Sequence, residues 1–443
     1  MKAVTLSAAL VALILTGCAQ TGAGTTVTTI PAPAPTAAPE KPLNALARDY
    51  VSLSLEIGTY EDGYIDAYYG PSELRTAAEN APRDQITLLR AVREMRDQLA
   101  RHQYPATDIN ARRAAFLDKQ LIAAETRLRM MSGRRFPFTE EAERLFGVRP
   151  VLRPLTAYDA GLAEIAKLVP GDGPLAARVD AYLDRFTIPK DKLLPVFQAS
   201  IAACRGRTEK HITMPPGEDF KLEFVTGKSW SGYNYYQGNF QSLIQINTDF
   251  PIRLSRAVDL GCHEGYPGHH ALNFLLEQRL TRGRDWVEYS VYPLYSPQSL
   301  IAEGTANYGI EMAFPGRFKQ IYEREILMPM AGIARPADDN YWKLTDAIKA
   351  VSGARLTIAQ MYLDGEIDRA RAVELTQKYL LMSPARAEQS VKFTETYRSY
   401  VINYGLGEAM VKADVERENG EAARWRRFEA LISEPTLPGD LRE

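Results

Sequence analysis

The sequence predicts a mainly helical protein that contains one short β insert. From Leu43 to about Gly206, and again from Pro251 to about Ile432, apolar residues recur at the three- and four-residue spacing of an amphipathic helix. Between these stretches, residues 211–247 carry glycines that separate short alternating runs, which is typical of strands joined by turns. We therefore expect a helical body with a small sheet or hairpin inserted near its middle.

The N-terminal segment predicts export and a lipid anchor. Lys2, a short apolar run and a small-residue stretch ending in Cys18 form the pattern of a signal peptide, and the run is shorter than the roughly 20 residues that span a bilayer. Leu15-Thr16-Gly17-Cys18 resembles the lipobox of bacterial lipoproteins, which implies removal of residues 1–17 and lipidation of the Cys18 thiol. The alternative is an ordinary signal peptide followed by a chance cysteine.

Residues 18–42 predict an extended tether, because their Thr/Ala/Pro composition cannot bury enough apolar area to fold. Residues 43–443 then form a single large, mostly helical domain. Since Ala19 rather than Asp follows the cysteine, we expect a location in the cell envelope, with the anchor in the outer membrane of a Gram-negative cell and the domain facing the periplasm.

The charge balance argues against nucleic acid as a partner. The chain has 53 Lys and Arg against 55 Asp and Glu, a net charge of -2, and therefore no excess of positive charge to neutralise phosphates. The expected contact with a membrane is through the N-terminal lipid alone.

The helical stretches are divided into helices of ordinary length. The clearest pattern runs from Ile109 to Met131, where four apolar residues at spacings of four, three and four mark one face: Leu117, Leu121, Ala124 and Leu128. Pro and Gly interrupt the first stretch at Gly70-Pro71, Tyr104-Pro105, Gly133, 150–154, 171–174 and Pro189.

Within the insert, residues 221–225 and 240–247 are the expected strands. Residues 241–247 could bind an extended peptide by edge addition, or could be a buried structural strand. Residues 230–236, rich in aromatic and amide groups, could line a pocket or form a packed turn. Cys204 and Cys262 could form a disulfide in an oxidising compartment or remain two buried thiols.

The richest polar cluster is His263-Glu264-Gly265-Tyr266-Pro267-Gly268-His269-His270, which holds three of the 5 histidines. Neutral imidazole is the commonest ligand for zinc in proteins, and a Glu directly after the first His is the arrangement in which zinc peptidases place a general base. The alternative is a set of helix-cap and core histidines around a Pro-Gly turn. In the ordinary motif, however, the two histidines lie four positions apart.

The spacing requires a break in the helix. On a regular helix His269 would point about 240° away from His263, and His270 would lie on the same face but about 10 Å along the axis. Pro267 and Gly268 permit a bulge or break that draws the second imidazole back. The apolar stripe downstream favours His269 as the inward ligand, with His270 beside it.

A third ligand is expected from residues 299–311. Glu303 is the preferred candidate because it lies in an apolar stretch, where a metal would offset the cost of burying a carboxylate. Asn307 could hold a ligand imidazole, and Glu311 is the reserve candidate.

These residues resemble a bacterial family known as domain of unknown function 885. The similar stretches are His263 to His270, Glu303-Gly304, the Asp66-Ala-Tyr-Tyr-Gly-Pro71 segment and residues 397–404, and they extend over nearly the entire mature chain. The resemblance implies a zincin-like helical metallopeptidase fold with an enclosed channel. It also implies a Zn²⁺ ion bound by His263, one or both of His269 and His270, and Glu303, with Glu264 as the base.

A late aromatic cluster supplies candidates for transition-state stabilisation. Tyr397, Tyr400 and Tyr404 recur at helical spacing beside Arg398, and their ordinary interpretation is a packing stripe. Tyr404 and Arg398 are the candidate catalytic residues that would stabilise an oxyanion or hold a peptide carboxylate.

The sequence therefore predicts a zinc-dependent hydrolase, in first place a peptidase that cleaves a peptide or small amide substrate in the cell envelope. The alternatives are a metallohydrolase for non-peptide amides and a non-catalytic envelope-binding lipoprotein. The sequence does not distinguish exopeptidase from endopeptidase activity.

Overall fold

The computed structural model describes residues 41–442. The signal peptide, Cys18 and residues 18–40 of the expected tether lie outside the described residues. The described chain is mainly helical with a few short strands, which confirms the predicted fold class. None of its helices is both long enough and apolar enough to cross a membrane.

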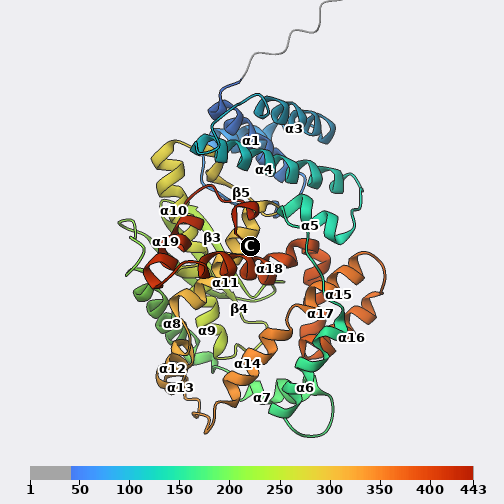
Figure 1. Ribbon diagram of the computed structural model, residues 1–443, viewed down its shortest axis with the longest axis vertical. Helices are drawn as coiled ribbons and strands as arrows, with labels where there is room; N and C mark the ends of the chain where they lie inside the picture. Colours follow the sequence, from blue (N-terminus) through green and yellow to red (C-terminus); the bar gives the residue numbers. More distant parts are fainter. Residues whose placement is uncertain (1–40, 443) are drawn as a thin grey trace, which may run out of the picture. The chain divides into compact units, whose positions relative to one another are not determined.

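The first half of the described chain is helical, and Figure 1 shows α1, α3 and α4 together at one end of this body. Residues 109–131 form one helix, as the apolar spacing predicts, and the Asp108 side chain accepts a hydrogen bond of 2.8 Å from the amide of Asn110 at its start. The helices are α1 (Leu43–Gly58), α2 (Ser72–Asn80), α3 (Gln85–Leu99), α4 (Ile109–Met131), α5 (Phe138–Phe146), α6 (Asp159–Leu168), α7 (Leu175–Asp184) and α8 (Leu193–Thr208).

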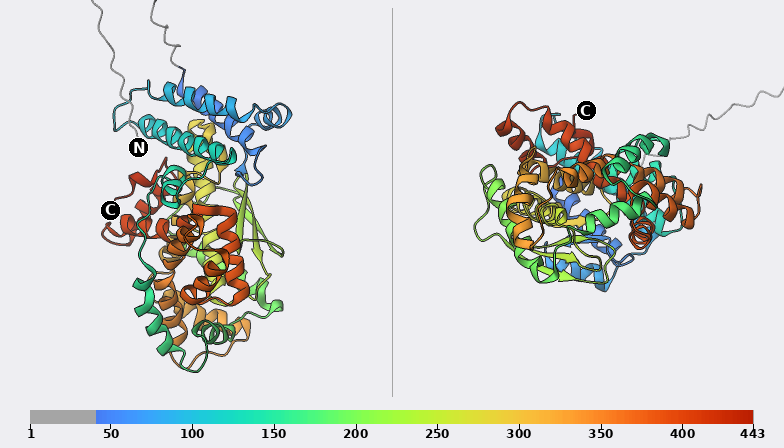
Figure 2. Two further views of the ribbon diagram at one scale, coloured as in Figure 1. Left: turned by 90° about the vertical axis from the view of Figure 1, so that its right-hand side faces the viewer. Right: turned by 90° about the horizontal axis from the view of Figure 1, so that it is seen from below.

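The β insert is a three-stranded sheet of β2 (Asp219–Val225), β3 (Gly232–Gly238) and β4 (Gln241–Asn247). Its order is β2-β4-β3, in which β4 pairs parallel with β2 and antiparallel with β3. Because β4 is the central strand, both of its edges are already hydrogen-bonded. The suggestion that residues 241–247 accept a peptide by edge addition is therefore wrong. In both views of Figure 2 the green strands lie along one side of the helical body.

A second, smaller sheet pairs β1 (Ile65–Tyr68) with β5 (Val291–Pro293) in antiparallel orientation. The remaining helices are α9 (Ser255–Leu260), α10 (His269–Leu276), α11 (Pro297–Ala313), α12 (Phe318–Tyr322), α13 (Met328–Ala331), α14 (Asn340–Val351), α15 (Ala354–Leu363), α16 (Arg369–Leu380), α17 (Pro384–Tyr397), α18 (Ile402–Glu416) and α19 (Glu421–Leu431). Together with the sheets they bury the apolar core.

Helix α11 is almost wholly buried and packs closely against α18. A Cβ atom on Gly304 of α11 would lie 2.5 Å from the carbonyl oxygen of Gly407 of α18. Only glycine permits this approach of the two backbones. The contact brings residues near the start of α18 beside Glu303, the neighbour of Gly304.

Candidate metal centre

Three predicted ligands from three elements converge at one point. His263 lies in the π-helical turn Gly261–Gly265 that continues α9, His269 begins α10, and Glu303 lies in the middle of α11. One ligand atom from each of the three residues lies within 4.8 Å of the others. Two imidazoles and one carboxylate are the donor set of a catalytic zinc site, which keeps a further coordination position open.

The carboxylate of Glu303 faces both imidazoles. Its Oε2 atom is 3.3 Å from Nε2 of His263, and its Oε1 atom is 3.7 Å from Nε2 of His269. Oε2 is buried without a hydrogen-bond partner among residues 41–442. A buried carboxylate oxygen that lacks a donor is costly, and a cation at this position would offset the cost. The donors present therefore fit the zinc ion implied by the sequence.

The electrostatics of the three residues are those of a charge-balanced cluster. Burial raises the pKa of Glu303, but the positive charges of His269 and His263 outweigh it and hold the pKa well below its usual range. For His269, burial lowers the pKa, while the charge of Glu303 acts in the opposite direction and raises it to about 9. A dication would take over this balancing role by displacing the proton of His269.

The chain reverses between the two histidines in the way that the six-residue spacing requires. The π-helical turn ends at Gly265, Tyr266 is extended with φ -125° and ψ 126°, and the amide of Gly268 donates a hydrogen bond of 3.1 Å to the carbonyl of Cys262. As a result the ring centroids of His263 and His269 lie only 4.7 Å apart. The break predicted at Pro267 and Gly268 is thus present.

Glu264 is positioned beside this cluster. Only 4% of its surface is exposed, its backbone carbonyl accepts a hydrogen bond of 2.7 Å from the Asn234 side chain, and its carboxylate lines the same cavity as the three ligands. Burial raises the pKa of Glu264, while the charge of His263 opposes the rise. A carboxylate with a raised pKa is suited to accept a proton and return it near neutral pH.

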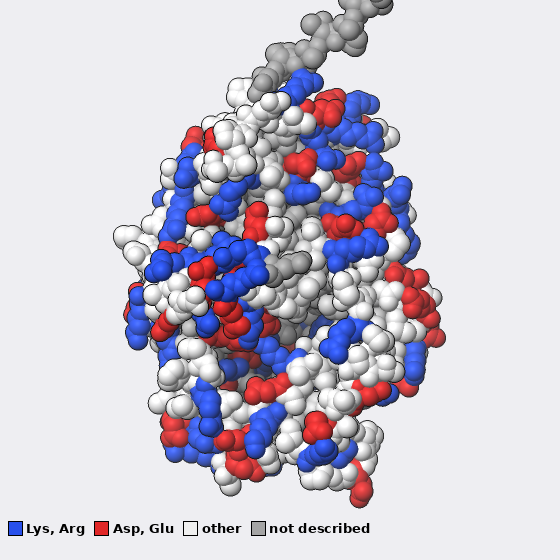
Figure 3. All heavy atoms as spheres, viewed as in Figure 1, with Lys and Arg blue, Asp and Glu red and all other residues white. Residues whose placement is uncertain are grey.

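The cluster opens into a cavity of about 1720 Å³, lined by residues from β3, α9, α11, α14, α15, α17 and α18 among others. The face shown in Figure 3 is hollowed near its middle, with both red and blue side chains around the hollow. Such a volume exceeds the range of about 300–1,000 Å³ that is usual for pockets that hold small molecules.

Two tyrosines line the cavity next to the cluster. The hydroxyl of Tyr400 donates a hydrogen bond of 2.8 Å to Oε1 of Glu303, and Tyr404 lies next to it with a ring-centroid distance of 5.9 Å. Burial raises the pKa of both phenols well above the usual value, so both remain hydrogen-bond donors at neutral pH. Tyr397 ends α17 and a 3₁₀ turn follows, so the three rings form a row but do not share one helix face.

Comparison with family models and with curated proteins finds no match, so the resemblance to domain of unknown function 885 stays a prediction. Among solved structures, the chain is similar to a candidate lipoprotein from Colwellia psychrerythraea, with a TM-score of 0.46 and 16% identity over 78% of this chain and 66% of that one. The match thus spans just under two thirds of that protein's length. It is also similar to the M32 carboxypeptidase from Deinococcus radiodurans R1, with a TM-score of 0.35 and 12% identity over 88% of this chain and 89% of that one.

His270 does not join the other two histidines. Its Nε2 lies 3.0 Å from Glu218, its Nδ1 lies 2.8 Å from the hydroxyl of Ser242, and its side chain is fully buried. Consecutive positions at the start of a helix point about 100° apart, so only one of the pair can face His263. With both ring nitrogens engaged, His270 is removed from the expected ligand set.

Arg398 is likewise held elsewhere. Its guanidinium forms an ion pair of 2.7 Å with Glu141 of α5, and it is not among the residues that line the cavity. Its backbone has a positive φ of 53° between the end of α17 and the 3₁₀ turn. The structure therefore corrects the expectation that Arg398 holds a substrate carboxylate.

Asn307 and Glu311 also have structural partners. The Asn307 amide donates to the backbone carbonyls of Glu303, at 3.0 Å, and Tyr404, at 3.4 Å, and so ties α11 to α18 rather than orienting an imidazole. Glu311 is bound by Lys349 and Lys412.

Sequence reasoning gave no role to Asp66, although this residue of β1 lines the cavity beside the cluster. Burial raises the pKa of Asp66 to about 6, although a hydrogen bond from Tyr233 and the charge of His269 lower it. Asp66 begins one of the stretches on which the predicted family resemblance rests, but nothing near it in the sequence indicates a metal site.

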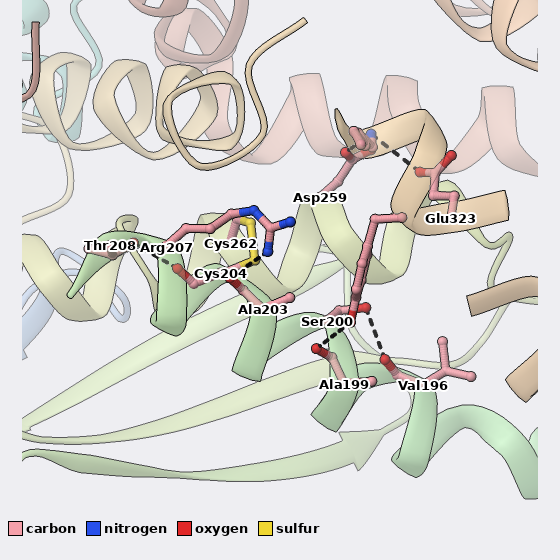
Figure 4. The surroundings of a disulfide bond; sticks show 12 residues. Val196, Ala199, Ser200, Ala203, Cys204, Arg207, Thr208, Asp259, Cys262 and Glu323 are labelled. Carbon is pink, nitrogen blue, oxygen red and sulfur yellow. Dashed lines mark hydrogen bonds and ion pairs between the residues drawn. A yellow bond between two sulfur atoms is a disulfide. The ribbon is translucent and has the colours of Figure 1, made fainter. Parts of the chain in front are cut away.

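A disulfide fixes the turn that carries His263. Cys204 of α8 is bonded to Cys262, so of the two alternatives for these cysteines the structure has the bridge. Figure 4 shows the bond joining α8 to the helix that also carries Asp259. Because Cys262 directly precedes His263 in the chain, the bridge anchors the first ligand to the core.

Proposed function

We propose that the chain is a zinc-dependent hydrolase of the zincin-like type that cleaves peptide or amide bonds in the cell envelope, to which the lipid on Cys18 would attach it. The observation that carries the proposal is the meeting of His263, His269 and Glu303 beside the buried carboxylate of Glu264 in one large cavity. A zinc site with a structural role would need no carboxylate base beside its ligands.

In this mechanism His263, His269 and Glu303 would hold the zinc ion, which supplies a Lewis acid that lowers the pKa of water and polarises a carbonyl group. Glu264 accepts a proton from the attacking water and passes it to the leaving amine. The phenol of Tyr404 donates a hydrogen bond to the developing oxyanion. Tyr400 holds the Glu303 carboxylate in place through the hydrogen bond to Oε1.

The first test is the metal content of the full chain after supplementation with zinc. About one zinc per chain is expected for the wild type, with loss in His263→Ala and in Glu303→Gln. Glu311→Gln is the matched control, because it removes the same charge from the same helix at a residue whose partners are lysines. His270→Gln should also retain zinc.

The second test separates metal binding from catalysis. Glu264→Gln should retain zinc and lose hydrolysis of a mixed peptide library by at least about a hundredfold, as expected for removal of a general base. Hydrolysis that persists in this variant would exclude the proposed role of Glu264. Absence of zinc from a folded wild type would instead favour a non-catalytic envelope lipoprotein.

A further inference from the structure

Arg355 lines the cavity and has no partner among residues 41–442. Arg253, Lys319, Lys349 and Lys412, which line the same cavity, each form an ion pair with at least one carboxylate. The guanidinium of Arg355, the second residue of α15, makes no ion pair, hydrogen bond or ring contact among residues 41–442. Arginine that lines a cavity without an anionic partner is typical of a binding site for an anion that the substrate brings.

A second arginine lies on the helix of the metal centre. Arg256 belongs to α9 and precedes His263 by seven residues, which places it two turns away on the same face of a nearly continuous helix. Both residues line the cavity. The nearest carboxylate to Arg256 is that of Asp259, at 3.8 Å, and this carboxylate is already bound by Lys319.

The charges of the two arginines act on each other and on the candidate catalytic groups. Burial lowers the pKa of Arg355, and the positive charge of Arg256 lowers it further, while Tyr404 opposes both. Arg355 has no anionic partner among residues 41–442, and Arg256 shares the single carboxylate of Asp259 with Lys319, so an anion between the two guanidinium groups would be stabilised by both.

The distance fits the end of a peptide. Seven helical residues span about 10 Å along the axis, which an extended peptide covers in about three residues. The C-terminal carboxylate of a peptide whose scissile bond lies at the metal centre therefore reaches the level of Arg256. A planar carboxylate also matches the two-pronged geometry of a guanidinium group.

We propose that Arg256 and Arg355 together bind the C-terminal carboxylate of the substrate, so that the protein removes short fragments from peptides with a free C-terminus. This inference rests on the proposed function. In each cycle one water is consumed, the C–N bond breaks, a C–O bond forms, and a proton passes through Glu264 to the leaving amine. The released fragment is about three residues long, as the distance of about 10 Å requires.

The binding test uses the zinc-supplemented Glu264→Gln protein and a pentapeptide library of mixed sequence, synthesised once as free acids and once as C-terminal amides. Retention of each library on the immobilised protein is measured by mass spectrometry. The free acids should be retained about 10- to 100-fold better, as expected for charge-assisted hydrogen bonds. Arg256→Met and Arg355→Met, added singly and together, should reduce this preference, whereas Lys412→Met, which removes a paired cation from the same cavity, should preserve it.

Equal retention of acids and amides would overturn the inference. Preferential retention of Asp- and Glu-containing peptides in both libraries would also overturn it, because the arginines would then bind an acidic side chain.

The second measurement tests cleavage of the same two libraries by the wild type. Release of about three residues from free acids and not from amides supports both proposals. Retention of acids without any cleavage would leave the carboxylate site standing and exclude the peptidase.

Discussion

Gly268 lies against the backbone of His263 so closely that a Cβ atom on Gly268 would stand 1.8 Å from the His263 carbonyl oxygen. Nonbonded atoms do not approach to this distance, so no side chain fits at this position without movement of the backbone. The contact forms where the chain folds back after the π-helical turn, and it brings the ring of His269, six residues after His263, to a centroid distance of 4.7 Å from the His263 ring. Glycine at this position therefore permits an approach of the two histidines that a regular helix forbids.

Gly268→Ala should consequently lose zinc binding, because the chain cannot reverse without moving one of the two histidines. The measurement is zinc content together with the circular dichroism spectrum, which should remain mainly helical. Gly265→Ala is the matched control, since a Cβ atom there would meet the Phe220 ring at an ordinary 3.5 Å. Full zinc content in a folded Gly268→Ala protein would show that the reversal is not needed.

The two tyrosines near Glu303 should have separable effects. Tyr400 donates directly to Oε1 of Glu303, so Tyr400→Phe should weaken zinc affinity by about 10- to 100-fold, as is typical for partners that orient metal ligands. Tyr404 makes no hydrogen bond to a ligand side chain, so Tyr404→Phe should keep the affinity and lower kcat by about 10²- to 10³-fold if it stabilises the oxyanion. Zinc competition with a chromophoric chelator and steady-state kinetics measure the two quantities. Unchanged kinetics in Tyr404→Phe would remove it from the mechanism.

The sequence predicts local structure correctly where a single helix or turn determines it. The apolar spacing in residues 109–131 predicts the helix that the structure has at Ile109–Met131, because one periodic apolar face suffices to indicate it. The reversal at Pro267 and Gly268 was predicted for the same reason, since the requirement that His263 and His269 meet could be tested on a helical wheel. The candidate ligands could be chosen from the sequence because imidazole and carboxylate groups are the side chains that bind zinc.

Features that depend on contacts between residues far apart in the chain cannot be predicted from local sequence patterns. Whether His270 or His269 faces Glu303 depends on Glu218, which lies 52 residues before His270 in the sequence and binds it. The position of Arg398 depends on Glu141, 257 residues away. The strand β4 is central because it pairs with β2 as well as with β3, although β3 separates β2 from β4 in the sequence. No local pattern in the sequence encodes this order of strands.

The Cys204–Cys262 bond should contribute substantially to stability. The two residues are 58 positions apart, and closing a loop of that length in the unfolded chain corresponds to about 4 kcal/mol. The double variant Cys204→Ala with Cys262→Ala should unfold at lower denaturant concentration than the wild type, and reduction of the wild type should reproduce the shift. Reductant should have no effect on the double variant. Identical midpoints for the oxidised wild type and the double variant would contradict this prediction.

Glu323 should give the stability of the protein a distinct pH dependence. Burial raises the pKa of its carboxyl from 4.5 to about 7, although Lys319 opposes the rise, and the Trp342 indole donates a hydrogen bond of 2.7 Å to the carboxyl. Between these values the group binds a proton in the folded state and not in the unfolded state. The folded state therefore loses stability as pH rises from about 4.5 to 7, by up to about 3 kcal/mol, and the loss is complete above the folded pKa.

Glu323→Gln removes this titration and keeps an amide of similar shape beside Trp342. The stability of the variant relative to the wild type should therefore increase between pH 5 and pH 8, as measured by urea unfolding at several pH values. Glu325→Gln serves as the control because its side chain is exposed and paired with Arg335, so its difference from the wild type should stay nearly constant over the same range. If the Glu323→Gln difference is also constant, the carboxyl of Glu323 is ionised in the folded protein throughout and its charge is stabilised by Lys319, the cation 3.8 Å away.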